Sequence, residues 1–208
     1  MKKLLFLFFF ISLCSSLVSE SRFPPPFASS SKDQIKIYWC SRLTSEIQAF
    51  NNQLRVAFDS RFALFLPQEI DLSSYTKEKK DLVGYIEDLR ALKEAHILFL
   101  VTPFGRDCCW EVGWACGRGL FVIAYVENNL NFLEDSMVKE SLHCIITSSK
   151  KAYATITQDP TKKSKCYLIA SREELSPLVW KLYSSFVSQK SKTNELSAFI
   201  ERHIQNSR

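Results

Sequence analysis

From residue 35 onward, short apolar runs alternate with longer segments whose apolar residues recur every three or four positions. The short runs predict buried strands, and the longer segments predict amphipathic helices. Their alternation is typical of a parallel sheet that is covered by helices on both faces. The five predicted strands cover residues 35–39, 63–66, 97–101, 120–126 and 143–147. The predicted helices between them cover residues 44–59, 77–94, 107–118 and 130–141.

The last third of the chain has a less regular pattern. Residues 152–157 and 166–170 flank a polar segment and predict a hairpin, while 171–189 and 194–205 predict two helices. The expected fold is therefore α/β, a flavodoxin- or Rossmann-like three-layer sandwich with a five-stranded parallel sheet and a C-terminal hairpin and helices.

The first 33 residues stand apart from this pattern. Lys2 and Lys3 precede a mostly apolar run over residues 4–18, which is the layout of a secretory signal, with an uncleaved membrane anchor as the alternative. We thus expect a signal peptide or anchor at 1–21, a Pro- and Ser-rich linker at 22–33, and one domain at 34–208, of which 148–208 is the C-terminal extension. The segment predicts a secreted, periplasmic or membrane-anchored protein, without stable membrane contact after signal removal; a cytoplasmic location is the alternative.

Composition and charge narrow the choice of partners. The 208 residues suit one domain, and 46% hydrophobic with 24% charged residues is ordinary for a folded protein. The net charge of +5 is spread along the chain, which argues against nucleic acid. Of the seven cysteines, Cys40, Cys116 and Cys144 fall in or beside apolar runs, which favours free thiols. The cysteines form no Cys-x2-Cys pair and the histidines no ligand-like spacing, so we expect no metal site and no cofactor.

The chemistry is expected at the carboxyl ends of the strands, where ligands bind in such folds. The sequence contains no Gly-x-Gly-x-x-Gly, no Walker motif and no Gly-x-Ser-x-Gly. Its most informative stretch runs from Asp107 to Ala115. Asp107 and Glu111 are four residues apart, so on a helix their carboxylates share a face. Paired carboxylates of this kind serve glycosyl transfer; the alternative is an N-cap at Asp107 followed by a solvated acid.

Several segments together resemble the nucleoside 2-deoxyribosyltransferase family. They are Ile37-Tyr38-Trp39-Cys40-Ser41-Arg42-Leu43, Phe65-Leu66-Pro67-Gln68-Glu69, Asp88 in its helix, and Glu111-x-Gly113-x-Ala115 leading to Val122 and Tyr125. The resemblance implies that Glu111 is the nucleophile, that Tyr38 orients it, and that Gln68 and Glu69 lie near the base.

The same resemblance implies roles for four more residues. It makes Asp88 and Asp107 the carboxylates that contact the sugar and the leaving base. It also implies a homo-oligomer in which Asp135 and Met137 reach the site of a neighbouring subunit. The expected activity is cleavage or exchange of the N-glycosidic bond of a 2'-deoxyribonucleoside or its 5'-monophosphate, through a covalent glycosyl-enzyme.

The chain also departs from the family pattern. Asp107-Cys108 stands where many members have Gly-Thr, and Ser41-Arg42 stands where Gly-Pro is common. Trp110 adds bulk beside the nucleophile. In the related deoxynucleoside 5'-monophosphate N-glycosidases a 5'-phosphate lies near the first loop, and Ser41 with Arg42 suits that role. Two alternatives remain open: a TIR-like NAD glycohydrolase, and a non-catalytic nucleotide-binding or interaction module on the same fold.

Overall fold

The computed structural model describes residues 26–206 of the chain, apart from the side chains of Glu78, Lys192 and 194–206. The predicted signal or anchor at 1–21 lies outside the described residues. Where the predicted linker is described, it forms turns, and Phe27 packs its ring against Phe65 of the sheet. None of the helices in residues 26–206 is long and apolar enough to cross a membrane.

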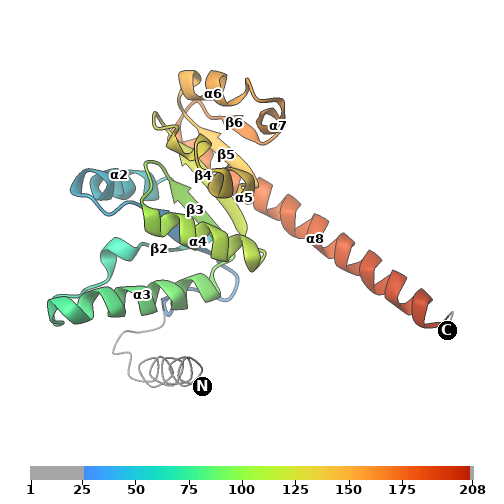
Figure 1. The fold of residues 1–208 in the computed structure, drawn as a ribbon, viewed down its shortest axis with the longest axis horizontal. Helices are drawn as coiled ribbons and strands as arrows, with labels where there is room; N and C mark the ends of the chain where they lie inside the picture. Colours follow the sequence, from blue (N-terminus) through green and yellow to red (C-terminus); the bar gives the residue numbers. More distant parts are fainter. Residues whose placement is uncertain (1–25, 207–208) are drawn as a thin grey trace, which may run out of the picture.

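The centre of the molecule is a six-stranded, fully parallel sheet in the order β2-β1-β3-β4-β5-β6 (Figure 1). The strands are β1 (Ile35–Ser41), β2 (Phe62–Phe65), β3 (Ile97–Val101), β4 (Phe121–Val126), β5 (Cys144–Thr147) and β6 (Cys166–Leu168). The chain passes from β1 to β2 on one side and returns to β3 on the other. The carboxyl ends of β1 and β3 therefore form the switch point at which a ligand crevice is expected.

Helices connect the strands and cover the sheet. They are α2 (Ser45–Arg55), α3 (Lys77–Glu94), α4 (Arg106–Gly117), α5 (Ser136–Ser141), α6 (Lys150–Ile156), α7 (Pro160–Lys163) and α8 (Leu175–Asn206). Short 3₁₀ turns lie at Pro67–Glu69, Asn131–Leu133 and Arg172–Glu174. This arrangement confirms the predicted three-layer α/β fold, with one more strand in the sheet than expected.

Two apolar cores lie on the two faces of the sheet. The first contains buried residues of α3, α4, α5 and α6, and the second contains residues of α2 and α8. Strand β1 contributes to both because its side chains alternate between the faces. Tyr38 and Cys40 enter the first core, and Ile37 and Trp39 enter the second. This alternation places Tyr38 under α3 and α4.

The predicted C-terminal hairpin is wrong. Residues 150–156 form helix α6, and β6 pairs in parallel with β5 instead of antiparallel with a preceding strand. The Ser149 side chain accepts a hydrogen bond from the backbone of Ala152 and caps the helix. Ala152 and Ile156, four residues apart, then bury the same helix face. The Tyr, Thr and Ile residues of this segment favour a strand locally, and the cap and packing override that preference.

The two predicted C-terminal helices are one continuous helix, α8. No Gly or Pro lies between residues 178 and 206, so nothing in the sequence stops the helix. Leu178, Leu182 and Phe186 pack against the second core. The later part of α8 extends away from the sheet (Figure 1). The predicted helix at 130–141 is split into a 3₁₀ turn and α5.

Candidate active site

Glu111 lies on the buried face of α4, together with Cys108, Val112 and Ala115. Only 9% of the residue is exposed. The Tyr38 hydroxyl at the centre of β1 donates a 2.8 Å hydrogen bond to its Oε1. The bond joins residues that are 73 positions apart in the chain, and it holds the carboxylate against the sheet. The predicted pairing of Tyr38 with Glu111 is thus present in the structure.

Burial governs the protonation of Glu111. Desolvation raises the pKa of its carboxyl, and the negative charge of Asp107, one helical turn earlier, raises it further. The Cys40 thiol and the Tyr38 hydroxyl act in the opposite direction. These two neighbours on β1 therefore offset part of the cost of burying the carboxylate.

Asp88 on α3 is the second carboxyl of this group. Burial raises its pKa to about 7, with the charge of Glu111 as the next cause, and the Tyr38 hydroxyl partly offsets the rise. Its Oδ1 is buried and has no hydrogen-bond partner in the described part of the chain. A buried oxygen without a partner is costly, which is typical of a site that a ligand completes. Asp88 and Glu111 thus form a pair suited to proton transfer and to nucleophilic attack.

Asp107 and Trp110 line the exposed side of α4. Gly105 is the N-cap of this helix, so the alternative of Asp107 as the cap is wrong; Asp107 lies in the first turn and is exposed. The Trp110 ring lies 5.7 Å from that of Tyr85 on α3, measured between centroids. These two aromatic residues form an exposed apolar surface between α3 and α4.

Ser41, Gln68 and Glu69 belong to a second group of polar residues, which sits against α2. The side-chain nitrogen of Asn51 on α2 donates to Ser41 Oγ at 2.7 Å and to Gln68 Oε1 at 2.9 Å. Glu69 forms an ion pair with Arg55 of α2. Ser41 is the neighbour of Cys40 in β1 and points to the other face of the sheet, toward α2. The structure therefore places Ser41 at the end of β1 and Gln68 and Glu69 in the turn after β2, all on the opposite face of the sheet from Tyr38 and Glu111.

The remaining predicted residues are less constrained. Arg42 is exposed directly after β1. Asp135 is the N-cap of α5, where its side chain accepts from the backbone of Val138 and from the thiol of Cys109 at 3.4 Å. Met137 is 52% exposed, and its sulfur lies close to Gly113 of α4. Asp135 and Met137 therefore contact α4 of their own chain.

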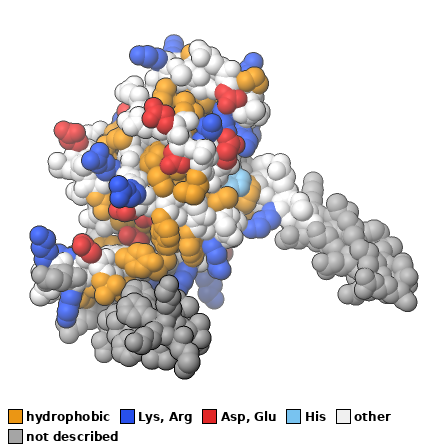
Figure 2. Space-filling model, viewed as in Figure 1, with side chains coloured by type: hydrophobic (Ala, Val, Ile, Leu, Met, Phe, Trp, Pro, Cys, Tyr) orange, Lys and Arg blue, Asp and Glu red, His pale blue; other side chains and the backbone are white. Residues whose placement is uncertain are grey.

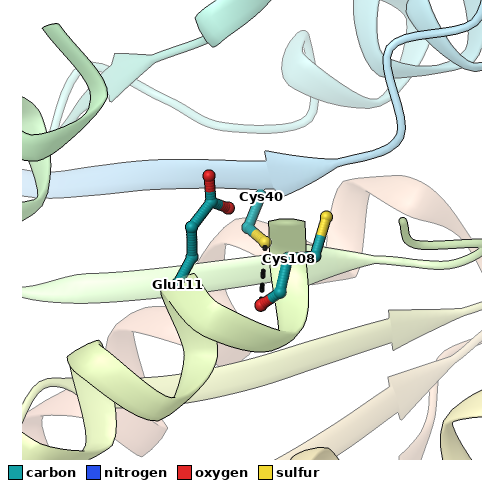
Figure 3. A group of neighbouring side chains, drawn as sticks. All are labelled: Cys40, Cys108 and Glu111. Carbon is teal, nitrogen blue, oxygen red and sulfur yellow. Dashed lines mark hydrogen bonds between the residues drawn. The ribbon is translucent and has the colours of Figure 1, made fainter. Parts of the chain in front are cut away.

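Two residues beside the candidate site were not predicted from the sequence. Asn51 is almost fully buried, and its Oδ1 has no hydrogen-bond partner among the described residues. The signal for it was a polar residue on the apolar stripe of α2, four residues after Ile47. The Cys40 thiol donates to the backbone oxygen of Cys108 at 4.0 Å (Figure 3), and its sulfur lies within 4.8 Å of a carboxylate oxygen of Glu111. Its position among apolar residues gave no such signal.

The chain was compared with protein families, curated proteins and solved structures, and matches were found among solved structures. No protein-family model matches the chain, and no curated protein matches it. Among solved structures, the chain is similar to a 2-deoxyribosyltransferase from the psychrotolerant bacterium Bacillus psychrosaccharolyticus. The alignment has 22% sequence identity and a TM-score of 0.37, and covers 53% of this chain and 84% of that one. This alignment says nothing about the chemistry of the site, which is argued from the residues of this chain alone.

Proposed function

We propose that this chain cleaves or exchanges the N-glycosidic bond of a 2'-deoxyribonucleoside or its 5'-monophosphate, with Glu111 as the nucleophile. The observation that carries the proposal is the buried Glu111 carboxylate, held by the Tyr38 hydroxyl at 2.8 Å beside a second carboxyl with a pKa near 7. Enzymes that break a glycosidic bond usually use two carboxyl groups, one protonated and one ionised. The resemblance of the segments around Tyr38, Asp88 and Glu111 to nucleoside 2-deoxyribosyltransferases supports the same activity.

In the first step an Oε atom of Glu111 attacks C1' of the sugar. The C1'–O bond forms as the C1'–N bond breaks, through an oxocarbenium-like transition state, and the electron pair of the broken bond leaves with the base. Asp88, protonated in part at neutral pH, donates a proton to that base. The product of this step is a glycosyl-enzyme ester at Glu111 and a free base.

In the second step an acceptor attacks C1' and releases Glu111 as a carboxylate. Asp88, now ionised, takes the proton that the acceptor loses, by microscopic reversibility. If water is the acceptor the enzyme is a hydrolase, and if a second base is the acceptor it is a transferase. In either case the enzyme returns to its starting protonation state.

The other residues of the site are assigned to binding. Asp107 contacts the sugar and Trp110 stacks beside the base. Arg42 and Ser41, at the end of β1, bind the 5' end of the sugar, where the guanidinium pairs with a phosphate. Gln68 and Glu69 are bound to α2 on the opposite face of the sheet from Glu111, and we assign them no contact with the base.

We also infer that a second copy of the chain covers the exposed apolar side chains around the site. Tyr85, Trp110 and Met137 are exposed on α3, α4 and α5. Figure 2 shows hydrophobic side chains gathered on this side of the molecule. Exposed apolar patches of this kind mark interaction surfaces. In the dimer, Asp135 and Met137 contribute to the site of the partner.

Product analysis tests the proposed function. The protein is incubated with deoxynucleosides, their 5'-monophosphates and NAD, each with and without an added acceptor base, and the released bases and new nucleosides are separated by chromatography. We expect base release from a deoxyribosyl substrate by the native chain and none by Glu111→Gln. Release of nicotinamide alone would favour an NAD glycohydrolase, and no product from any substrate would favour a non-catalytic module.

A further inference from the structure

Two cysteine thiols lie beside the carboxyl group of Glu111, the proposed nucleophile. Figure 3 shows Cys108 and Glu111 on α4 facing Cys40 at the end of β1. The two sulfurs and a carboxylate oxygen of Glu111 all lie within 4.8 Å of one another. In the described part of the chain, this is the one group of three such side chains close enough to share a metal ion. We propose that Cys40, Cys108 and Glu111 form a binding site for a thiophilic divalent cation, Zn²⁺, that blocks the catalytic carboxylate.

The donor set suits this cation. Thiolates bind zinc at about 2.3 Å and carboxylate oxygens at about 2.0–2.2 Å, usually in a tetrahedral arrangement. Two sulfurs on one tetrahedral zinc are about 3.8 Å apart. The two sulfurs, which lie within 4.8 Å of each other, therefore need to approach by at most about 1 Å, which rotation of the cysteine side chains provides. Two sulfurs also disfavour Mg²⁺ and Ca²⁺, which prefer oxygen ligands.

The three side chains supply three of the four positions of a tetrahedral site. The fourth position is open for water. Glu111 keeps a small exposed fraction and adjoins the exposed first turn of α4. A cation thus has a route to the site from the same side as a substrate.

Zinc binding releases two protons from the site. The Cys40 and Cys108 thiols each release a proton to solvent as the Zn–S bonds form, and the carboxylate of Glu111 donates an electron pair as the third ligand. No oxidant or reductant is needed. Because the bound cation occupies the Glu111 oxygen, this carboxylate can no longer attack a substrate. The site is therefore inhibitory, and it goes beyond the proposed function.

The sequence did not predict this site, because its two cysteines are 68 residues apart and neither belongs to a ligand-like spacing. The parallel pairing of β1 with β3 brings them together, since α4 follows β3 and starts beside the end of β1. Cys109, the neighbour of Cys108, points elsewhere and bonds Asp135. Cys144 is equally buried but belongs to the core on the other face of the sheet. These two cysteines are matched controls.

Zinc binding by the purified protein tests the proposal without any enzymatic assay. Thiols are kept reduced and counted, and the affinity for Zn²⁺ is measured by competition with a chromogenic chelator. Cd²⁺ is then used to detect thiolate-to-metal absorption. We expect one ion per chain, and a loss of affinity of more than about tenfold, the lower end for weakened metal sites, in each of Cys40→Ala and Cys108→Ala. Cys109→Ala and Cys144→Ala should bind as the native chain does.

Thermal unfolding of each variant shows whether it remains folded. The proposal is overturned if the native, reduced chain binds no zinc at micromolar concentration, if folded Cys40→Ala and Cys108→Ala bind as tightly as the native chain, or if the control variants lose binding equally. A catalytically inactive chain that still binds zinc through these residues would overturn the proposed function and leave the metal site standing.

Discussion

The Tyr38 hydroxyl donates a 2.8 Å hydrogen bond to Glu111 from the central part of β1 to the buried face of α4. This contact between Tyr38 and Glu111 results from the strand order of the sheet. Strand β1 pairs with β3, and α4 follows β3, so the two side chains meet under α3 although they are far apart in the sequence. The bond stabilises the ionised form of Glu111 in an environment that otherwise favours the neutral acid.

The first prediction concerns this bond. Tyr38→Phe removes the donor while keeping the ring that stacks on Phe65. A hydrogen bond to a charged group contributes about 1.5–3 kcal/mol, so we expect kcat/KM to fall by about 10- to 150-fold. Since Tyr38 lowers the pKa of Glu111, its loss should also move the acidic limb of the pH–rate profile to higher pH. The control is Tyr125→Phe, whose hydroxyl bonds Ser148 at 3.2 Å; an equal effect there would contradict a specific role for Tyr38.

The second prediction concerns Asp88. The pKa of its carboxyl is raised from 3.8 to about 7, chiefly by burial. In the proposed mechanism the protonated form donates to the leaving base, so activity should decline as pH rises through about 7. Asp88→Asn should lower kcat by about 10²–10⁴-fold and remove this limb. Retention of the limb in the variant would assign it to another group.

Asp88 also has an effect on stability. Because its pKa is higher in the folded chain than in the unfolded chain, its contribution to the free energy of unfolding is lost as pH rises from about 4 to about 7. We therefore expect Asp88→Asn to be more stable, relative to the native chain, at pH 8 than at pH 5. The difference in the free energy of unfolding should be on the order of a few kcal/mol. Denaturant unfolding at both pH values measures the gain. The exposed Asp81 on the same helix is the control, and Asp81→Asn should show no such change.

The third prediction concerns the 5' end of the substrate. If Arg42 pairs with a phosphate, Arg42→Ala should raise KM for the monophosphate by about tenfold or more, since hydrogen bonds to charged groups contribute about 1.5–3 kcal/mol. The KM for the unphosphorylated nucleoside should stay unchanged. Arg42→Lys keeps the charge and should recover part of the affinity. Equal changes for both substrates would remove the phosphate assignment.

The fourth prediction concerns assembly. Met137 is half exposed on α5, beside α4, and in the proposed dimer it contacts the partner. Met137→Glu places a charge in that apolar contact and should shift the chain from dimer to monomer in sedimentation velocity, with a parallel loss of activity. Val56, an exposed apolar residue after α2, provides the control, since Val56→Glu should leave the dimer intact. A native chain that is monomeric and fully active would contradict the shared site.

The fold was predictable where hydrophobic patterns are strong. The strand that ends at Val101 is fully apolar, and the strand around Tyr38 is apolar apart from Lys36 and Ser41, so both were recognisable as buried strands. Residues 150–156 were misassigned because local β-preference competed with a helix cap that only the structure reveals. The motif around Glu111 predicted its place beside Tyr38, and the structure contains that contact. Cys40 and Asn51 were missed because their roles depend on neighbours that the fold supplies from distant segments.

The most direct test of the account is to identify the residue that becomes covalently modified. The native chain is incubated with a deoxyribosyl substrate and quenched in acid, and the peptide that contains Glu111 is analysed by mass spectrometry. We predict an increase by one deoxyribosyl group on Glu111, with the base absent, and no adduct in Glu111→Gln. Turnover without any adduct on Glu111, or an adduct on a different residue, would contradict the central claim.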